Sequence, residues 1–311
     1  MAGAIQANSA SRFAAAHESG ANRALAYLTR EVPRWQRENR CASCHNNGDG
    51  ARVLYIARRL HYRVGSPALT STTGWLAHPA QWDSNRGNPA FSDKNLARIQ
   101  FAASLLEAFD AGIVKDRAAL RAAAHSLLDS QQRDGSWSVD AGAAVGSPVT
   151  YGPYLATYMA RRTLDAARRS GADRLAEPIA RATAWFSASH PTTVLDRAVV
   201  ILAGTDHADS QRPAILEARN PDGGWGPFRY APSEAFDTAV VLLALDAVKE
   251  LPQVREAIAG GRAWLLKSQL DTGDWPETTR PAGLQSYAQH VSTTAWATEA
   301  LMVTGSSSQT K

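Results

Sequence analysis

Apolar residues recur along the chain at helical spacing, and two kinds of helix alternate. The stretch 256–269, EAIAGGRAWLLKSQ, is amphipathic, whereas 236–248, FDTAVVLLALDAV, is apolar on nearly all sides. An amphipathic helix covers a core with one face, and a helix that is apolar all round is itself enclosed. Period-2 alternation is nearly absent, and the β-branched residues fall inside helical runs. The pattern predicts an all-α protein built from outer and inner helices.

Six segments have the character of inner helices: those near 50–61, 94–109, 151–164, 196–204, 237–249 and 293–303. Helix pairs stacked in a row would leave an open end, whereas a closed double ring buries every inner helix. We therefore expect a single (α/α)6 toroid over residues 19–304, with a flexible segment at 1–18 and a disordered tail at 305–311. Residues 62–92 are assigned to neither kind of helix.

Three of the connections between helices share one pattern, in which Gln or Arg is followed after three residues by Gly and then, after one more, by Trp. They are Gln131–Gly135–Trp137, Arg219–Gly223–Trp225 and Gln269–Gly273–Trp275. Their spacing indicates a repeat of about 45 residues, and a copy that has lost its Gly and Trp stands at 182–193. Glycine allows a tight turn and tryptophan can pack on the preceding helix end, so these residues are interpreted as structural.

These turns, with DGSW and DGGW, and the FDTAVVLLAL run resemble the QW repeats of the terpenoid cyclase and protein prenyltransferase superfamily. The resemblance covers roughly residues 95–303. It implies an α/α toroid that holds an isoprenoid-like or other apolar molecule in its barrel. The superfamily's chemical motifs are missing: the D-x-D-D acid of squalene–hopene-type cyclases, the metal-binding D-D-x-x-D, and the D-x-C pair of zinc prenyltransferases.

Three residues remain as cavity candidates for catalysis. Asp196 and Asp237 each stand at the start of an inner helix, where capping is the first interpretation and acid catalysis the second. His290 stands before the last inner helix, where a zinc-binding histidine of a prenyltransferase could lie, although a hydrogen-bonded rim histidine is the simpler interpretation. Ser292 and Thr293 are interpreted as caps of that helix.

The two cysteines of the chain stand together in CASCH, at residues 41–45. C-x-x-C-H is the spacing that attaches haem c through two thioethers, so Cys41 and Cys44 are predicted attachment sites and His45 the axial iron ligand. The motif replaces the Gly–Trp turn before the first inner helix, which would place the haem at the mouth of the toroid. The conceivable second ligands of the iron are His61, His78, His290, Met159 and Met302. A reactive dithiol, a zinc site lacking an evident fourth ligand, and a strained disulfide are the alternatives.

Charge and hydropathy limit which classes of binding partner and which cellular location we expect. The formal charge is +4 without a dense Lys/Arg run, which argues against nucleic-acid binding. No apolar run reaches the roughly 18 residues of a membrane-spanning helix. The N-terminus MAGAIQANSASRF lacks the pattern of a signal peptide. Because haem c is attached on the exported side of bacterial membranes, the haem hypothesis predicts a periplasmic or exported protein with a leader outside this sequence. Without haem, a cytoplasmic protein is expected.

Three functions follow as hypotheses. The first is a haem-dependent protein that transfers electrons to a redox partner or oxidises an apolar ligand in the barrel. The second is a divergent terpenoid cyclase, an isomerase or lyase with Asp196 or Asp237 as acid, or an isoprenoid-binding protein; CASCH is then a thiol or metal site. The third is a scaffold that binds a lipid or a peptide without catalysis.

Overall fold

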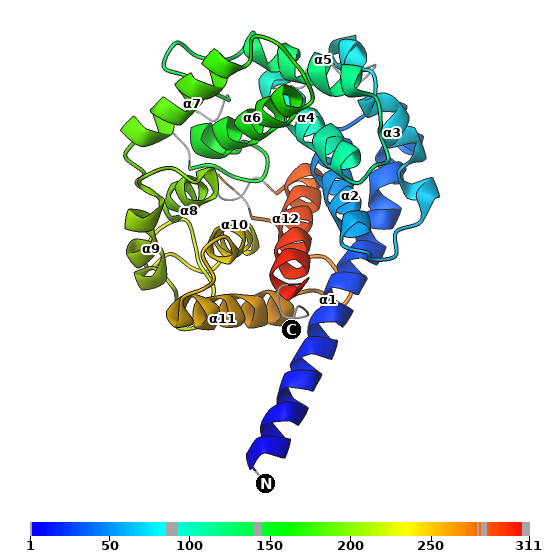
Figure 1. The fold of residues 1–311 in the computed structure, drawn as a ribbon. Helices are drawn as coiled ribbons and strands as arrows, with labels where there is room; N and C mark the ends of the chain where they lie inside the picture. The colour runs from blue at the N-terminus through cyan, green and yellow to red at the C-terminus, as the bar shows by residue number, and fades with distance from the viewer. Residues whose placement is uncertain (1, 85–92, 140–144, 279, 281–284, 307–311) are drawn as a thin grey trace.

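A computed structural model describes residues 2–84, 93–139, 145–278, 280 and 285–306 (Figure 1). These residues are helices and connections, and within them the one strand-type pairing is an isolated bridge between Gln131 and Trp137. None of the described helices has the length and apolarity needed to span a membrane.

The helices form two concentric rings. The inner ring consists of η1 (Cys44–Gly50) with α2 (Ala51–Arg59), α4 (Lys94–Asp110), α6 (Gly152–Arg169), α8 (Val194–Ala203), α10 (Ala235–Asp246) and α12 (Tyr287–Ser306). The outer ring consists of α1 (Ala2–Asn39), α3 (Thr70–Leu76), α5 (Arg117–Leu128), α7 (Ala176–Ala188), α9 (Ala208–Glu217) and α11 (Pro252–Ser268). Each inner helix packs against the next, and α12 returns to α2, which closes the ring (Figure 1). The predicted (α/α)6 toroid is confirmed.

The stretch that the sequence left unassigned supplies the second outer element. It folds into η2 (Ser66–Ala68), α3 and η3 (Pro79–Ser84), and residues 85–92 lie outside the described residues. At the ends of the chain, α1 begins at Ala2 and its first half projects away from the rings (Figure 1). The predicted boundaries of the toroid domain, after residue 18 and after residue 304, stay a prediction. Residues 307–311 of the expected tail lie outside the described residues.

The three Gly–Trp turns bind α5 to α6, α9 to α10 and α11 to α12. The three tryptophans are fully buried, and each indole N–H donates to a carbonyl ten residues upstream, at the end of the preceding outer helix. The pairs are Trp137 with Leu127, Trp225 with Ile215 and Trp275 with Leu265, each at 2.8 Å. The backbone N–H of each tryptophan donates to a threonine hydroxyl of the following inner helix. These turns are therefore structural joints of the ring.

A glutamine in two of these turns joins neighbouring repeats. The Gln131 amide donates across its turn to the Gly135 carbonyl at 3.0 Å and to the Pro178 carbonyl of α7 at 2.8 Å. Gly135 has φ of +98°, and a Cβ there would stand 2.3 Å from the carbonyl oxygen of Arg181 in α7. The turn thus requires glycine both for its left-handed backbone and for the close approach of α7.

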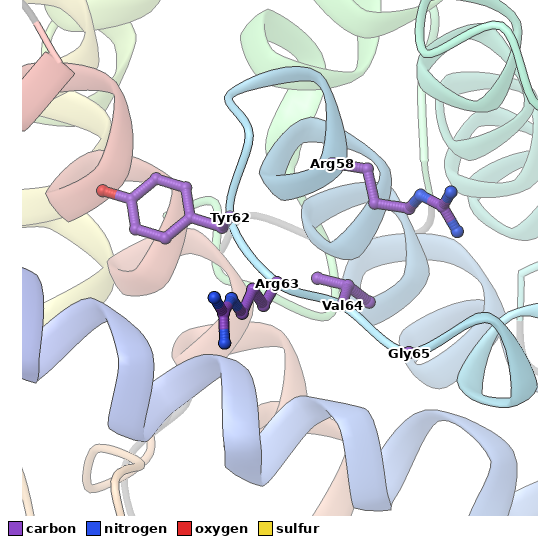
Figure 2. A pocket seen from close by; sticks show the side chains of 5 residues that line it. All are labelled: Arg58, Tyr62, Arg63, Val64 and Gly65. Atoms are coloured by element: carbon purple, nitrogen blue, oxygen red, sulfur yellow. The ribbon is translucent and has the colours of Figure 1, made fainter.

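Helix α2 ends in a motif that turns the chain across the helix terminus. His61 has φ of +65°, the N–H of Tyr62 donates to the carbonyl of Ala57, and the N–H of His61 donates to that of Arg58. This pattern of bonds is the Schellman motif, which usually has glycine at the left-handed position. The chain that follows, together with Arg58 at the end of α2, lines a pocket (Figure 2).

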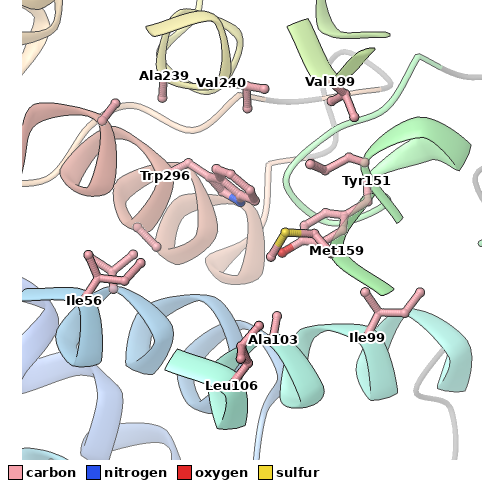
Figure 3. Close-up of a cluster of buried hydrophobic side chains, with 14 of the residues drawn as sticks. Ile56, Ile99, Ala103, Leu106, Tyr151, Met159, Val199, Ala239, Val240 and Trp296 are labelled. Carbon is pink, nitrogen blue, oxygen red and sulfur yellow. The ribbon is translucent and has the colours of Figure 1, made fainter. Parts of the chain in front are cut away.

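Side chains of the inner ring fill the barrel axis (Figure 3). Trp296 lies at the centre with its ring centroid 5.9 Å from that of Tyr151 and 5.8 Å from that of Phe236, both in edge-on contact. The three rings are at most 2% exposed. Aliphatic side chains such as Ile99 and Val240 surround them and are fully buried. The centre of the toroid is therefore a packed core in this conformation.

Candidate functional site

The segment that contains the two cysteines leads into the first inner helix and places an acidic side chain inside the ring. Ser43 is the N-cap of η1, and its hydroxyl accepts hydrogen bonds from two backbone N–H groups of the first turn. Asn46 donates to a backbone carbonyl of α1 at 2.9 Å, and Asn47 donates to a threonine hydroxyl of α3 at 2.7 Å. These buried bonds fix η1 between two outer helices, so Asp49 at its end enters the barrel.

Asp49 is fully buried and accepts hydrogen bonds from other inner helices. Tyr151, the residue just before α6, donates its hydroxyl to Oδ1, while Ser292 of α12 and Gln100 of α4 donate to Oδ2, each at 2.8 Å. Arg52 of α2 has its Nε 3.8 Å from Oδ1. Burial raises the pKa of Asp49 to about 6, although Arg52 and the three donors act to lower it. Asp49 can therefore hold and release a proton near neutral pH.

Tyr151 adopts a strained backbone to reach this carboxyl group. Its φ is +58° and its ψ is −38°, a sparsely populated conformation that costs a residue other than glycine about 1–3 kcal/mol. The side chain is fully buried between Asp49 and Trp296. Backbone strain of this kind is concentrated at functional sites, because the surrounding structure must impose it.

A hydrogen-bond chain leads from Asp49 towards the surface through Ser292 to His45. The Ser292 hydroxyl gives its hydrogen to Asp49, so its oxygen accepts the Nδ1–H of His45 at 3.0 Å. Burial lowers the pKa of His45 to about 4. The imidazole is therefore neutral at pH 7, with a lone pair on Nε2, and it is partly exposed. The chain connects a buried acid to a group that solvent can reach.

The centre of the barrel also contains a buried cation with unused donors. The Arg52 guanidinium is 1% exposed, pairs with Glu299 of α12, and stacks 4.3 Å from the Trp296 ring centroid. Its Nε and Nη2 make no hydrogen bond in the described part of the chain. Gln100 Oε1, Ser104 Oγ and Trp296 Nε1 are likewise buried without a partner there. Each such group costs about 1–3 kcal/mol, so their concentration here is not explained by stability.

The two cysteines are enclosed. Cys41 and Cys44 are free, with side chains in residues only 7% and 8% exposed. Burial, followed by the nearby charge of Asp49, raises the pKa of the Cys44 thiol to about 12, so it is no reactive thiolate. Thioethers to both sulfurs require an open face beside both residues, which this conformation does not present, and haem attachment stays a prediction. No group of three or more His, Cys, Asp or Glu in the described residues is arranged to hold a metal ion.

The conceivable second iron ligands are distributed over the structure. Met159 and Met302 lie in the apolar core, His61 lies at the C-terminal end of α2, and the ring of His78 is bonded to the Gly74 carbonyl at 2.7 Å. His290 belongs to a separate acidic cluster at the start of α12. Its Nε2 contacts Asp274 and its Nδ1 lies 3.2 Å from Glu277.

The two predicted acids have structural partners of their own. Asp196 is the third residue of α8 and forms a capping box with Thr193, as each accepts the backbone N–H of the other, at 3.4 and 3.0 Å. Asp237 is fully buried in the first turn of α10, and Arg280 donates to both of its oxygens at 2.9 and 3.3 Å. Burial raises the pKa of Asp237, while Arg280 acts to lower it.

The structure thus brings together residues that the sequence did not indicate as a site. His45 was predicted, but its partner Asp49 was not, although it stands in the same stretch. Its signal was weak: an acidic residue that opens an apolar helical run, with Arg52 inside that run. Ser292 is not a cap, because α12 begins at Tyr287 and Ser292 lies in its interior, where it bonds Asp49.

Comparison with known proteins identifies the fold. The chain is similar to a variant of the type II terpene cyclase MstE from Scytonema solved with geranylgeranyl dihydroxybenzoate (TM-score 0.63, 14% identity, 94% of this chain and 99% of that chain covered). MstE without a ligand gives a TM-score of 0.59 at 15% identity, covering 92% and 98% of the two chains. A protein from Actinoplanes gives 0.57 at 16% identity, covering 93% and 99%. No protein-family model and no curated protein matches the sequence. The chain therefore has a terpene cyclase-like α/α-toroid fold.

Proposed function

We propose that the protein transfers a proton from Asp49 to a carbon–carbon double bond of an isoprenoid-class molecule. The observation that supports this most is the buried carboxyl group at the N-terminal ends of the inner helices, with its pKa raised to about 6. A general acid works best when its pKa lies near the working pH. The terpene cyclase-like fold suggests the substrate class, since MstE is described in complex with an isoprenoid substrate.

The reaction would be an isomerisation. The Asp49 O–H gives its proton to one alkene carbon, and the π electrons form the new C–H bond. A second alkene attacks the resulting cation to close a ring, and loss of a proton from carbon restores a double bond, so no atoms are gained or lost. Tyr151, Ser292 and Gln100 remain as donors to the carboxylate that forms. The chain through Ser292 to His45 offers a route for the proton to return.

A substrate requires the packed axis to open. Trp296 is the side chain we expect to move, because its indole N–H has no partner among the described residues and stacking on Arg52 is its main polar contact. Its displacement would expose the unused donors of Arg52 beside Asp49. A ligand can then compensate the buried polar groups that this conformation leaves unpaired.

The test is incubation with polyprenyl substrates in D2O, followed by mass spectrometry. Squalene and geranylgeranyl dihydroxybenzoate are suitable probes. We expect an isomer of unchanged formula that has gained one deuterium, and Asp49→Asn should abolish it while retaining the helical circular dichroism of the wild type.

The matched variant is Asp237→Asn, which removes the other fully buried aspartate at an inner-helix start. Turnover that survives Asp49→Asn but is lost in Asp237→Asn would overturn the assignment of the acid. Saturable binding of both probes without turnover would instead support the hypothesis of a lipid-binding scaffold.

A further inference from the structure

A pocket of about 440 Å³ lies at the C-terminal end of α2, the opposite end of that helix from Asp49 (Figure 2). It is lined by Arg58, Tyr62, Arg63, Val64 and Gly65. Its volume is in the range of small-molecule sites, which is roughly 300–1,000 Å³. The pocket is separate from the packed barrel axis, so it is available without rearrangement of the core.

The charges of the pocket are positive and uncompensated. Within the described residues, neither Arg58 nor Arg63 forms an ion pair with a carboxylate, and the one hydrogen bond of the Arg58 guanidinium is to the Ser66 hydroxyl at 3.3 Å. The adjacent Arg59 differs, because it lies 3.1 Å from the buried Glu107. Two guanidinium groups without acidic partners beside a hollow favour an anionic ligand.

Neighbouring groups strengthen the positive potential. Tyr62 lies close enough to Arg262 to influence the pKa of that guanidinium, which burial lowers to about 10. Arg262 itself donates to the Leu301 carbonyl at 2.8 Å and to a threonine hydroxyl, and in the described residues it has no ion pair with a carboxylate. A buried cation, on which the carboxylate of Asp246 also acts, therefore lies near the phenol ring that lines the pocket.

The backbone carbonyl groups at the end of α2 already accept hydrogen bonds within the chain. The last carbonyls of a helix normally carry its negative end and would repel an anion. Here the carbonyls of Ile56, Ala57 and Arg58 accept the N–H groups of Leu60, Tyr62 and His61. This arrangement depends on His61 in the left-handed region, where a residue other than glycine is uncommon. The strained turn thus fixes residues 62–65 across a helix end whose acceptors are already used.

We propose that this pocket binds the phosphate or diphosphate group of a small anionic molecule between Arg58 and Arg63, whose exposed side chains leave opposite sides of the loop in Figure 2 and turn inwards to reach the ligand. The planar guanidinium group matches phosphate oxygens in pairs of parallel hydrogen bonds. The Tyr62 side chain, which points towards α12 in Figure 2, and Val64 provide a partly apolar wall for the organic part of the ligand. The proposal is independent of proton transfer at Asp49.

The test is titration of the full-length protein with inorganic pyrophosphate, followed by isothermal calorimetry at low and at physiological salt. We expect saturable binding at one site, weakened about tenfold or more by Arg58→Gln and by Arg63→Gln, since a charged hydrogen bond contributes about one tenfold step in affinity or more. Arg117→Gln is the matched control, because Arg117 is an exposed arginine at the start of α5, away from the pocket. All three variants should melt at the temperature of the wild type.

Vesicles of phosphatidylcholine with and without phosphatidic acid provide a second arm. Binding to the acidic vesicles that both pocket variants lose, without binding of free pyrophosphate, would support the pocket and assign its phosphate to a lipid. Absence of saturable binding in both arms, or an equal loss in Arg117→Gln, would overturn the proposal.

Discussion

Asp49 and His45 should make opposite contributions to the pH dependence of stability, and single substitutions should separate them. The pKa of Asp49 rises from 3.8 to about 6 on folding. Between these pH values the folded protein holds a proton that the unfolded chain has released, so the free energy of unfolding falls as pH rises. The pKa of His45 falls from 6.5 to about 4. Between those values the unfolded chain holds the extra proton, so the free energy of unfolding rises with pH.

The two contributions are of similar size. Each pKa moves by about two units, and one unit corresponds to about 1.4 kcal/mol, so each group contributes about 3 kcal/mol across its window. The windows overlap between about pH 4 and pH 6, and the signs are opposite. In the wild type the two slopes therefore largely cancel, and each becomes visible when the other group is removed.

The assay is urea unfolding from pH 4 to pH 7, analysed as the difference between wild type and variant so that other titrating groups cancel. Relative to the wild type, Asp49→Asn should gain about 3 kcal/mol as pH rises from 4 to 6. His45→Gln should lose about 3 kcal/mol relative to the wild type from pH 4 to pH 6.5. Asp209→Asn removes an exposed carboxylate on α9 and serves as the control. Difference curves for Asp49→Asn and His45→Gln that stay as flat as that of the control would refute this account of the buried pair.

Three further predictions concern the centre, the turns and the cysteines. Arg52→Met should lower the free energy of unfolding by about 3–5 kcal/mol, because it leaves two carboxylates in the barrel without their cation; a loss below about 1 kcal/mol in urea unfolding would contradict this. Gly135→Ala should reduce thermal stability more than Gly171→Ala, since both have positive φ but only at 135 does the new Cβ meet a carbonyl; equal melting temperatures would count against it. Protein made in a host that attaches haem c should stay colourless, and a Soret band that survives denaturation and vanishes in Cys41→Ser/Cys44→Ser would show that the enclosed thiols do carry haem.

The fold could be predicted from the sequence because its signals are local. The alternation of amphipathic and apolar helices and the repeated Gly–Trp turns each lie within about 20 residues, and the turn geometry around Trp137 and Trp225 follows from that pattern. Ring closure could be predicted because only a closed ring buries every inner helix, and the count of inner helices then gave its size. The partner of the turn glutamine in the next repeat could not be predicted. For Gln131 this partner is the Pro178 carbonyl, and the contact depends on how α7 approaches the turn.

The site could not be predicted because its members are far apart in sequence. Asp49, Gln100 and Ser292 come from different inner helices, and Tyr151 comes from the start of a fourth, so they meet only when the ring is closed. No short sequence motif indicates that such distant residues come together. C-x-x-C-H, by contrast, is a strong local motif, and it pointed to the cysteines as the site. The haem stays a prediction, and the environment of Cys44 in the apolar core now argues for a packing role of that side chain.

The contact between the last Gly–Trp turn and α1 has a consequence for how the protein is made. The Gln269 amide donates to the carbonyl of Gly20 at 2.9 Å, and α12 packs against both α1 and α2. During synthesis the first five helix pairs can only form an arc, with apolar edges on α2 and α10 that nothing yet covers. An exposed edge of this kind is prone to aggregation until the final pair emerges from the ribosome. Ser292 belongs to that final pair, so its hydrogen bond to Asp49 cannot form before the last helix has been synthesised.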